Sequence, residues 1–207
     1  MRRIFVTGIG TDVGKTVVAA ILTEALQADY WKPVQSGTLT DSDTATVNKL
    51  IQNKKSRFHP EAYRLPLPLS PHAAAEAENI TIELKNIQLP ETANHLVIEG
   101  AGGLLVPLNN IKLMVDLLPI FACEVVLVSR NYLGSINHTL LTWEALKNRN
   151  INILGLIFNG EPNTASEDFI LNYTGLPKLL SVLPEEKLTL EIISDYAVQL
   201  RDRLNVL

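Results

Sequence analysis

This 207-residue chain has few cysteine, tryptophan and methionine residues: one cysteine, two tryptophans and two methionines. It also has no large excess of charge of one sign. A single cysteine, Cys123, excludes an intrachain disulfide framework. Its apolar neighbours favour a buried small side chain over a nucleophile. The 18 basic and 22 acidic side chains give a net charge of -4. This balance argues against a surface for nucleic acid, so we expect no such partner.

Long hydrophobic runs are also missing, and no stretch reaches the length of a membrane span. The chain starts with Met-Arg-Arg and then enters an apolar segment, which is unlike a signal peptide. We therefore expect a cytoplasmic protein with no membrane partner. Its length predicts one domain over residues 1–207.

The most informative segment that is present is GIGTDVGKT at residues 8–16, which follows an apolar run and precedes good helix formers. In a strand–loop–helix arrangement of this kind, backbone N–H groups and the helix N-terminus face a phosphate. Lys15 adds positive charge, and the Thr16 hydroxyl suits a Mg²⁺ ion. The segment predicts binding of a nucleoside triphosphate. The alternative is a turn that leads into an ordinary helix.

The loop departs from the common spacing, because five residues separate Gly8 from Gly14 where the usual pattern has four. The usual first glycine would fall at Ile9. Either the loop is one residue longer than usual, or it uses Gly10 in another way.

Short apolar runs alternate with helical patterns along the chain. This alternation predicts an α/β fold, an open and mainly parallel twisted sheet with helices on both faces. Strands are expected at residues 4–7, 30–34, 96–98, 125–129, 151–158 and 179–183. Helices are expected at residues 14–28, 41–52, 72–77, 81–87, 135–148 and 190–204, with 169–174 helical or irregular and 53–71 a loop.

Ligands of such sheets bind beyond the carboxyl ends of the strands, where polar residues gather in this chain. Glu99 ends an apolar strand. It is either a Mg²⁺ ligand or a carboxylate that emerges into solvent or caps the glycine turn. Lys32 either reaches the solvent or stabilises a transferred phosphoryl or carboxylate group. Asp43 is a first-turn helix acid or a second metal ligand. Residues 133–138 begin a helix, and they are either a binding site for a carboxylate or a glycine turn with a Ser or Asn cap.

Several motifs occur in one order along the chain: GIGTDVGKT (8–16), KPVQSG (32–37), DSD (41–43), SPH (70–72), EGAGG (99–103) and LGSINH (133–138). Together they closely resemble the dethiobiotin synthetase family, which has a phosphate-loop (P-loop) NTPase fold with three α/β/α layers. The resemblance covers positions 4 to about 184. The loop with five residues between its glycines is that family's own variant.

The resemblance implies an ATP-dependent carboxylation. A substrate amine of 7,8-diaminononanoate adds CO₂, the carbamate takes the γ-phosphate of ATP, and the neighbouring amine closes the ring with loss of phosphate. It implies a Mg²⁺ ion, and a homodimer in which a helix of the partner binds the substrate carboxylate.

The residues carried over by the resemblance fall into four sets. The catalytic set is Lys15, Lys32 and Thr11, and the Mg²⁺ ligands are Thr16, Asp43 and Glu99. The ATP set is Gly10, Asp12, Val13, Gly14, Lys15, Thr16, Val17, Asn159 and Pro184. The diamine set is Thr11, Lys32, Ser36, Gly102, Gly134, Ser135 and Asn137.

Two positions depart from the family pattern. Gly10 stands where an acid is common, and Asp12 stands where many relatives carry glutamate. One alternative enzyme is an amide synthase of the cobyrinate type, but 207 residues leave no room for its usual glutaminase domain. The other alternative is a nucleotide-switch ATPase of the partitioning type. That class carries a second lysine in the loop, whereas Lys15 is the only lysine before Lys32 in this chain.

Overall fold

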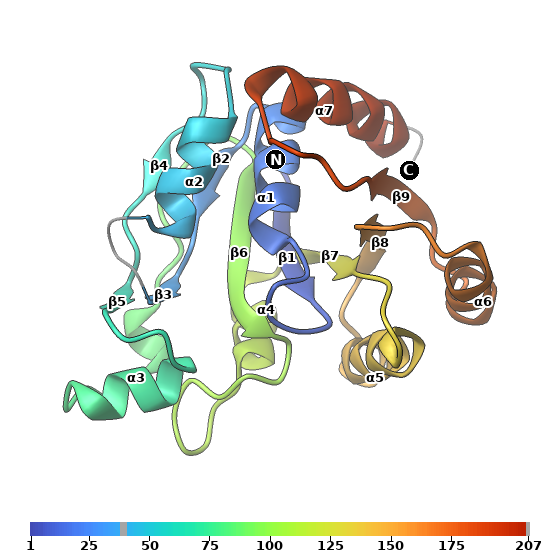
Figure 1. The fold of residues 1–207 in the computed structure, drawn as a ribbon. Helices are drawn as coiled ribbons and strands as arrows, with labels where there is room; N and C mark the ends of the chain where they lie inside the picture. Colours follow the sequence, from blue (N-terminus) through green and yellow to red (C-terminus); the bar gives the residue numbers. More distant parts are fainter. Residues whose placement is uncertain (38–40, 206–207) are drawn as a thin grey trace.

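The computed structural model describes residues 1–37 and 41–205, and its centre is a seven-stranded sheet in which every neighbouring pair is parallel. Helices lie on both faces of this sheet (Figure 1). The α/β prediction is therefore confirmed. In spatial order the strands are β4 (Phe58–His59), β2 (Asp29–Trp31), β6 (Leu96–Gly103), β1 (Arg3–Gly8), β7 (Glu124–Ser129), β8 (Ile153–Asn159) and β9 (Lys178–Val182).

Alternate residues of each strand feed two cores on opposite faces, as the strand period of two requires. Ile4 and Val6 of β1 pack with the helices α1 (Lys15–Leu26), α2 (Asp43–Leu50) and α7 (Leu190–Leu204). Phe5 packs in the opposite core, which is covered by α3 (Pro71–Ala77), α4 (Leu117–Phe121) and α5 (Ser135–Lys147). A smaller separate cluster joins Leu127, Leu156 and Phe158 to Ile170 of α6 (Thr164–Thr174). Among the described residues, no helix has the length and apolar character that crossing a membrane would require.

The central strand β1 lies where the order of the chain reverses. From β1 the chain moves to β2 on one side of the sheet, returns to β6 beside β1, and then continues to β7 on the other side. In open parallel sheets this reversal opens a crevice at the carboxyl ends of the strands. The loop at residues 8–14 leaves β1 at this crevice.

The strand predicted at residues 30–34 is in fact two strands in two different sheets. β2 ends at Trp31, and β3 (Val34–Ser36) pairs with β5 (Tyr63–Leu65) in a separate parallel pair. Pro33 causes the break because it has no N–H to donate to a strand ladder. Lys32 lies at this break, so its side chain is not restricted by the alternation of a continuous strand.

Other predicted boundaries are corrected by contacts between distant segments. The expected loop at residues 53–71 contains β4 and β5, and the expected helix at 81–87 is a single 3₁₀ turn, Leu84–Asn86. There the carbonyl of Ile82 accepts a bond from Asn109 at 2.6 Å, so a tertiary contact replaces a helical one. The helix α4 was not predicted, and α6 begins five residues before position 169.

Cys123 lies in the core on the α4 side, with 9% of its surface exposed. Burial raises the pKa of its thiol to about 12. The side chain is therefore a protonated packing group, as its apolar neighbours predicted.

The buried carboxylate of Asp29 joins β2, β4 and the segment before β6. Its oxygens accept bonds from Thr92 Oγ1 at 2.7 Å, the Arg57 N–H at 3.0 Å and Asn94 Nδ2 at 3.2 Å. A fourth contact joins it to His59 Nε2 at 3.1 Å. Burial raises the pKa of Asp29, but these hydrogen bonds outweigh it and hold the pKa below its ordinary value. Such a carboxylate stabilises the fold while it is ionised.

We expect Asp29→Asn to lower the free energy of unfolding by about 1–3 kcal/mol at pH 7, because the amide places a donor among donors. The stabilisation by ionised Asp29 is fully present above the pKa that Asp29 has in the unfolded chain. It is lost as pH falls through the lower pKa that Asp29 has in the folded protein. The variant should therefore lose less stability than the wild type below about pH 4. Urea unfolding between pH 3 and 7 measures both effects, with exposed Asp195→Asn as the control. Equal stability of Asp29→Asn and wild type at pH 7 would contradict this role.

Candidate functional site

The loop after β1 is shaped by two residues in the left-handed region, Asp12 with φ 57° and Gly14 with φ 94°. Gly14 has a second constraint, because a Cβ there would lie 2.1 Å from Asn159 Nδ2. That nitrogen donates to the Val13 carbonyl at 3.0 Å. The last residue of β8 therefore holds the loop in place, and only glycine fits at position 14.

Lys15 folds back over the same loop and donates to the Gly10 carbonyl at 2.8 Å. Its burial, and secondly the charge of Lys32, lower the pKa of Lys15 to about 8. A Cβ on Gly10 would meet nothing within 4 Å. Position 10 therefore has room for a side chain, and what the loop uses there is the backbone carbonyl.

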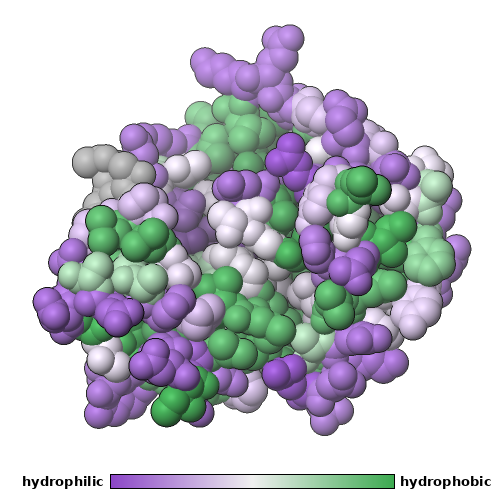
Figure 2. Space-filling view, turned by 60° about the horizontal axis from the view of Figure 1, so that its bottom comes forward, coloured by the Kyte–Doolittle hydropathy of each residue, from purple (hydrophilic) through white to green (hydrophobic). Residues whose placement is uncertain are grey.

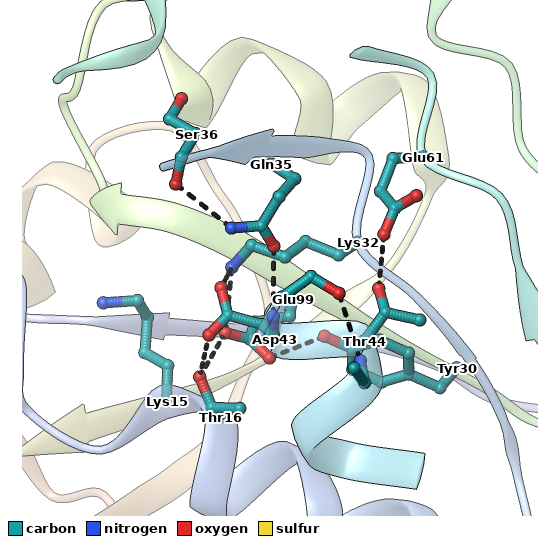
Figure 3. Close-up of polar contacts among 12 residues, drawn as sticks. Lys15, Thr16, Tyr30, Lys32, Gln35, Ser36, Asp43, Thr44, Glu61 and Glu99 are labelled. Atoms are coloured by element: carbon teal, nitrogen blue, oxygen red, sulfur yellow. Dashed lines mark hydrogen bonds and ion pairs between the residues drawn. The ribbon is translucent and has the colours of Figure 1, made fainter. Parts of the chain in front are cut away.

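Lys32 lies between two carboxylates, as Figure 3 shows. Its Nζ lies 2.7 Å from Asp43 Oδ2 and 3.0 Å from Glu99 Oε1, and only 4% of the side chain is exposed. The lysine does not extend to solvent, so that alternative is wrong. Burial alone would lower the pKa of Lys32, but Glu99 and Asp43 outweigh burial and raise it. Lys32 is therefore a fixed cation at the carboxyl edge of the sheet.

Glu99 is the fourth residue of the eight-residue strand β6, and it is 1% exposed. The strand was predicted to end just before it, and the alternative of a solvent-exposed carboxylate is also wrong. Its neighbour across the ladder is Val6 of β1, two residues before Gly8. This register places the carboxylate beside the loop that leaves β1.

Three oxygens converge at the start of α1. Thr16 Oγ1 lies 2.8 Å from Asp43 Oδ1 and 2.9 Å from Glu99 Oε1. The hydroxyl has one proton, so it donates to only one carboxylate at a time. Hydroxyl and carboxylate oxygens are the ligands that a hard divalent cation prefers. Among the described residues, no group of three His, Cys, Asp or Glu side chains could hold a metal. A cation here would therefore also need oxygens from a nucleotide or water.

Asp43 is the first residue of α2, but the cap of this helix is Ser42, whose side chain accepts from the Ala45 N–H. The Asp43 carboxylate is thus free to meet Lys32 and Thr16. Burial raises the pKa of Asp43, but Lys32 outweighs it and the net pKa is lowered. Gln35 Oε1 accepts from the Asp43 N–H at 3.2 Å and positions this end of the helix.

Sequence reasoning gave no role to Gln35, Tyr30 or the segment around Pro68. Tyr30 donates from its hydroxyl to Glu99 Oε2 at 2.8 Å. Burial, with the nearby charge of Glu99, raises the pKa of Tyr30, so the phenol stays protonated. In the sequence Tyr30 looked like one more residue of a buried strand. The only signal was a hydroxyl-bearing side chain two positions before Lys32.

A cavity of about 630 Å³ opens over these groups. It brings together most of the predicted phosphate, metal and substrate residues, with the loop before α3 as its far wall. Its lining residues are Thr11, Asp12, Gly14, Lys15, Thr16, Lys32, Ser36, Asp43, Pro68, Leu69, Ser70, Pro71, Glu99, Ala101, Gly102 and Val106. The Ser36 hydroxyl is buried and has no partner among the described residues.

A second cavity, of about 420 Å³, lies on the other side of the loop and brings together Val17, Asn159 and Pro184. Arg130 also lines it and was not among the predicted residues. Its guanidinium donates to the Asp12 carbonyl at 3.2 Å. This contact supports the loop from the β7 side of the sheet.

The predicted residues at the start of α5 lie apart from the first cavity. Gly134 and Asn137 line a cavity of about 700 Å³ that shares no lining residue with it. The expected Ser or Asn cap is wrong, since Gly134 caps the helix with φ 102° and no side-chain bond. Ser135, also predicted as a substrate contact, is buried in this chain, and its N–H donates to the Tyr132 carbonyl.

We expect ADP affinity to fall as pH rises through 8, because Lys15 in the free protein then loses the proton that makes it a phosphate ligand. The dissociation constant should rise about tenfold between about pH 8 and pH 9.2, since ADP itself is already fully ionised. Calorimetry over this range, without metal, measures the change. Lys15→Arg is the control, because a guanidinium keeps its charge and should flatten the profile. A wild-type constant independent of pH would contradict the assignment.

Comparison with known proteins places the chain in a family. A family model described as an AAA domain matches residues 2–191. The ATP-dependent dethiobiotin synthetase of Cytophaga hutchinsonii is 56% identical over 203 residues, which is 98% of each chain. That of Christiangramia forsetii is 52% identical over 201 residues, covering 97% of this chain and 96% of the relative.

Among solved structures, the septum site-determining protein MinD of Pyrococcus horikoshii, complexed with Mg-ADP, has a TM-score of 0.63. It is 15% identical and covers 99% of this chain and 96% of its own, so the likeness concerns the fold alone. The relatives match at much higher identity and over nearly the whole length of both chains. The chain therefore belongs to the ATP-dependent dethiobiotin synthetase family and is an ATP-dependent ligase.

Proposed function

We propose that this protein, acting in the cytoplasm as one domain, converts 7,8-diaminononanoate, CO₂ and ATP into dethiobiotin, ADP and phosphate. The observation that carries the proposal is the position of Lys32. Its ammonium group is buried between Asp43 and Glu99, at the start of the helix that follows the phosphate loop. It shares one cavity with Thr11, Ser36 and Gly102, so a phosphate and an organic substrate can meet beside it.

The chemistry needs no nucleophilic side chain. One substrate amine adds CO₂ and loses a proton to give a carbamate. A carbamate oxygen then attacks the γ-phosphorus and ADP leaves, which gives a mixed carbamic–phosphoric anhydride. The second amine attacks the carbonyl carbon, the C–O bond to phosphate breaks, and the ureido ring closes. Catalysis of this kind depends on positioning and on stabilising charge.

The cations of the cavity fit this sequence of steps. Lys15 and the N–H groups of the loop would stabilise charge on the transferred phosphoryl group. Lys32 would offset charge on the carbamate oxygen and on the same phosphoryl group. Thr11 and the Ser36 hydroxyl, which has no partner among the described residues, would contact the carbamate or the diamine, next to the backbone of Gly102.

Mg²⁺ would be held by Thr16, Asp43 and Glu99, together with nucleotide phosphate oxygens. The convergence of the Thr16 hydroxyl with oxygens of both carboxylates supports this assignment. When bound, the ion supplies positive charge that neutralises the β- and γ-phosphates.

The nucleotide would extend from this cavity across the loop into the second one. The Gly10 carbonyl orients Lys15, and Asp12, Val13 and Gly14 form the turn around the phosphates. Asn159 would contact the adenine, with Val17 and Pro184 beside it. Since Asn159 Nδ2 already bonds the Val13 carbonyl, its carbonyl oxygen is the atom available to a base amino group.

The carboxylate end of the diamine would be bound by Gly134 and Asn137 of a second subunit. Two observations support a homodimer with its substrate site at the interface. The start of α5 is separate from the Lys32 cavity within one chain. The same region also exposes large apolar side chains, notably Leu133, Leu141, Phe169 and Tyr173. Figure 2 shows apolar areas on both sides of a paler middle on the face that it displays.

The first test is the diamine dependence of phosphate release. Purified protein with MgATP and bicarbonate should release phosphate only when 7,8-diaminononanoate is added, in equal amounts with dethiobiotin. Phosphate and product are measured in the same samples, with a monoamine analogue as the control. Phosphate release that does not depend on the diamine would contradict the proposal and favour an amide synthase or a nucleotide switch.

Mixed dimers test the interface. Lys32→Ala and Asn137→Ala should each be nearly inactive, because each damages every site of its own dimer. Equal mixing should restore about a quarter of wild-type activity, since half of the dimers are mixed and each mixed dimer has one intact site. Activity is measured after the subunits have exchanged, with each variant alone as the control. No recovery in dimers shown to be mixed would place both residues in the site of one chain.

A further inference from the structure

Tyr30 is bonded to the one oxygen of Glu99 that the proposed chemistry leaves unused. The phenol donates to Oε2 at 2.8 Å, while Thr16 and Lys32 both approach Oε1, at 2.9 Å and 3.0 Å. The two oxygens of one carboxylate therefore have different surroundings. Oε1 meets Thr16 at the start of α1, whereas Oε2 meets the buried phenol, and Figure 3 shows Thr16 and Tyr30 on different sides of Glu99.

We propose that Tyr30 is a positioning residue which holds Glu99 so that only Oε1 is presented to Thr16 and to a bound cation. This inference rests on the proposed role of Glu99 as a metal ligand. Tyr30 does not touch substrate or nucleotide in this scheme. It acts through the carboxylate alone.

The surroundings of Tyr30 suit a fixed support. Its side chain is completely buried, and its ring lies 5.7 Å from that of Phe58 at a tilt of 47°. In the ladder Tyr30 pairs with Val97, so the phenol comes from the strand next to Glu99. A rigid aromatic side chain with two χ angles keeps its hydroxyl in one place.

A carboxylate limited to one oxygen distinguishes between cations. Mg²⁺ takes octahedral coordination at short distances and accepts single carboxylate oxygens. Ca²⁺ is larger, takes six to eight ligands and often binds a carboxylate through both oxygens. With Oε2 bonded to Tyr30, one of its lone pairs is occupied and rotation of the carboxylate is restrained, which disfavours a bidentate contact. Tyr30 therefore favours Mg²⁺ over Ca²⁺ and orients the ligand that binds it.

The test uses the full chain with ADP and bound Mn²⁺, followed by electron paramagnetic resonance, with Mg²⁺ or Ca²⁺ added as the competitor. In Tyr30→Phe the ring remains, and Glu99 keeps its Oε1 contacts but loses the bond that fixes Oε2. We expect Mg²⁺ to bind about tenfold more weakly than to wild type, the lower end of the loss seen when a hydrogen-bond partner of a metal ligand is removed. Ca²⁺ should lose less, so the ratio of the two dissociation constants changes. Tyr63→Phe removes a hydroxyl that bonds Glu83 and Asn86 outside the cavity, and it should change neither constant.

Equal weakening of both ions in Tyr30→Phe, or no weakening, would overturn the inference, because a merely structural hydroxyl would not alter the ratio. If wild type itself binds no Mn²⁺ with ADP, the proposed metal role of Glu99 fails and this inference fails with it. A crystal structure of wild type with Mn²⁺ and ADP gives an answer even if Tyr30→Phe does not fold. One Glu99 oxygen on the metal, with Tyr30 still on the other, supports the inference. Two oxygens on the metal overturn it.

Discussion

The buried ammonium group of Lys32 is the constraint on which the arrangement of the site depends. A charge this deeply buried is costly unless it is paired, and removing one partner leaves the others uncompensated. Here the partners are Asp43 at the start of α2 and Glu99 within β6. Because Thr16 Oγ1 lies within hydrogen-bond distance of both carboxylates, the same cluster ties these elements to the start of α1. Four segments are thereby oriented around one point.

The backbone provides the space for this cluster. Pro33 ends β2 and sends the chain into a second small sheet, which leaves Lys32 at the gap between β2 and β3. β6 continues past Glu99 instead of ending there, so Glu99 stays paired with Val6 of β1, while β2 on the other side ends level with Ile98. A cation and an anion inside a parallel sheet would otherwise conflict with the apolar faces that such a sheet buries. The two charges are tolerated because they form an ion pair at the gap between β2 and β3.

The charge of Lys32 also affects the second lysine of the site, Lys15. The pKa of Lys15 is lowered to about 8 by burial and then by Lys32. Its only hydrogen-bond partner among the described residues is the Gly10 carbonyl, which is uncharged. An arriving phosphate would supply the missing negative charge and restore a stable ammonium. The free site is thus arranged for an anion, while Asp43 and Glu99 remain occupied by Lys32 and Thr16.

The amino-acid sequence by itself determined the fold class, the phosphate loop and its flanking strand and helix, because these depend on local periodicity and on glycines next to Gly-Lys-Thr. It left open whether Lys32 and Glu99 face solvent or a bound group, and it gave no role to Tyr30, Gln35 or Arg130 and no sign of the short strands β4 and β5. Only the tertiary structure decided these points. The contacts join residues such as Tyr30 and Glu99, which are 69 positions apart. Their meeting depends on strand order and register, which no local spacing contains.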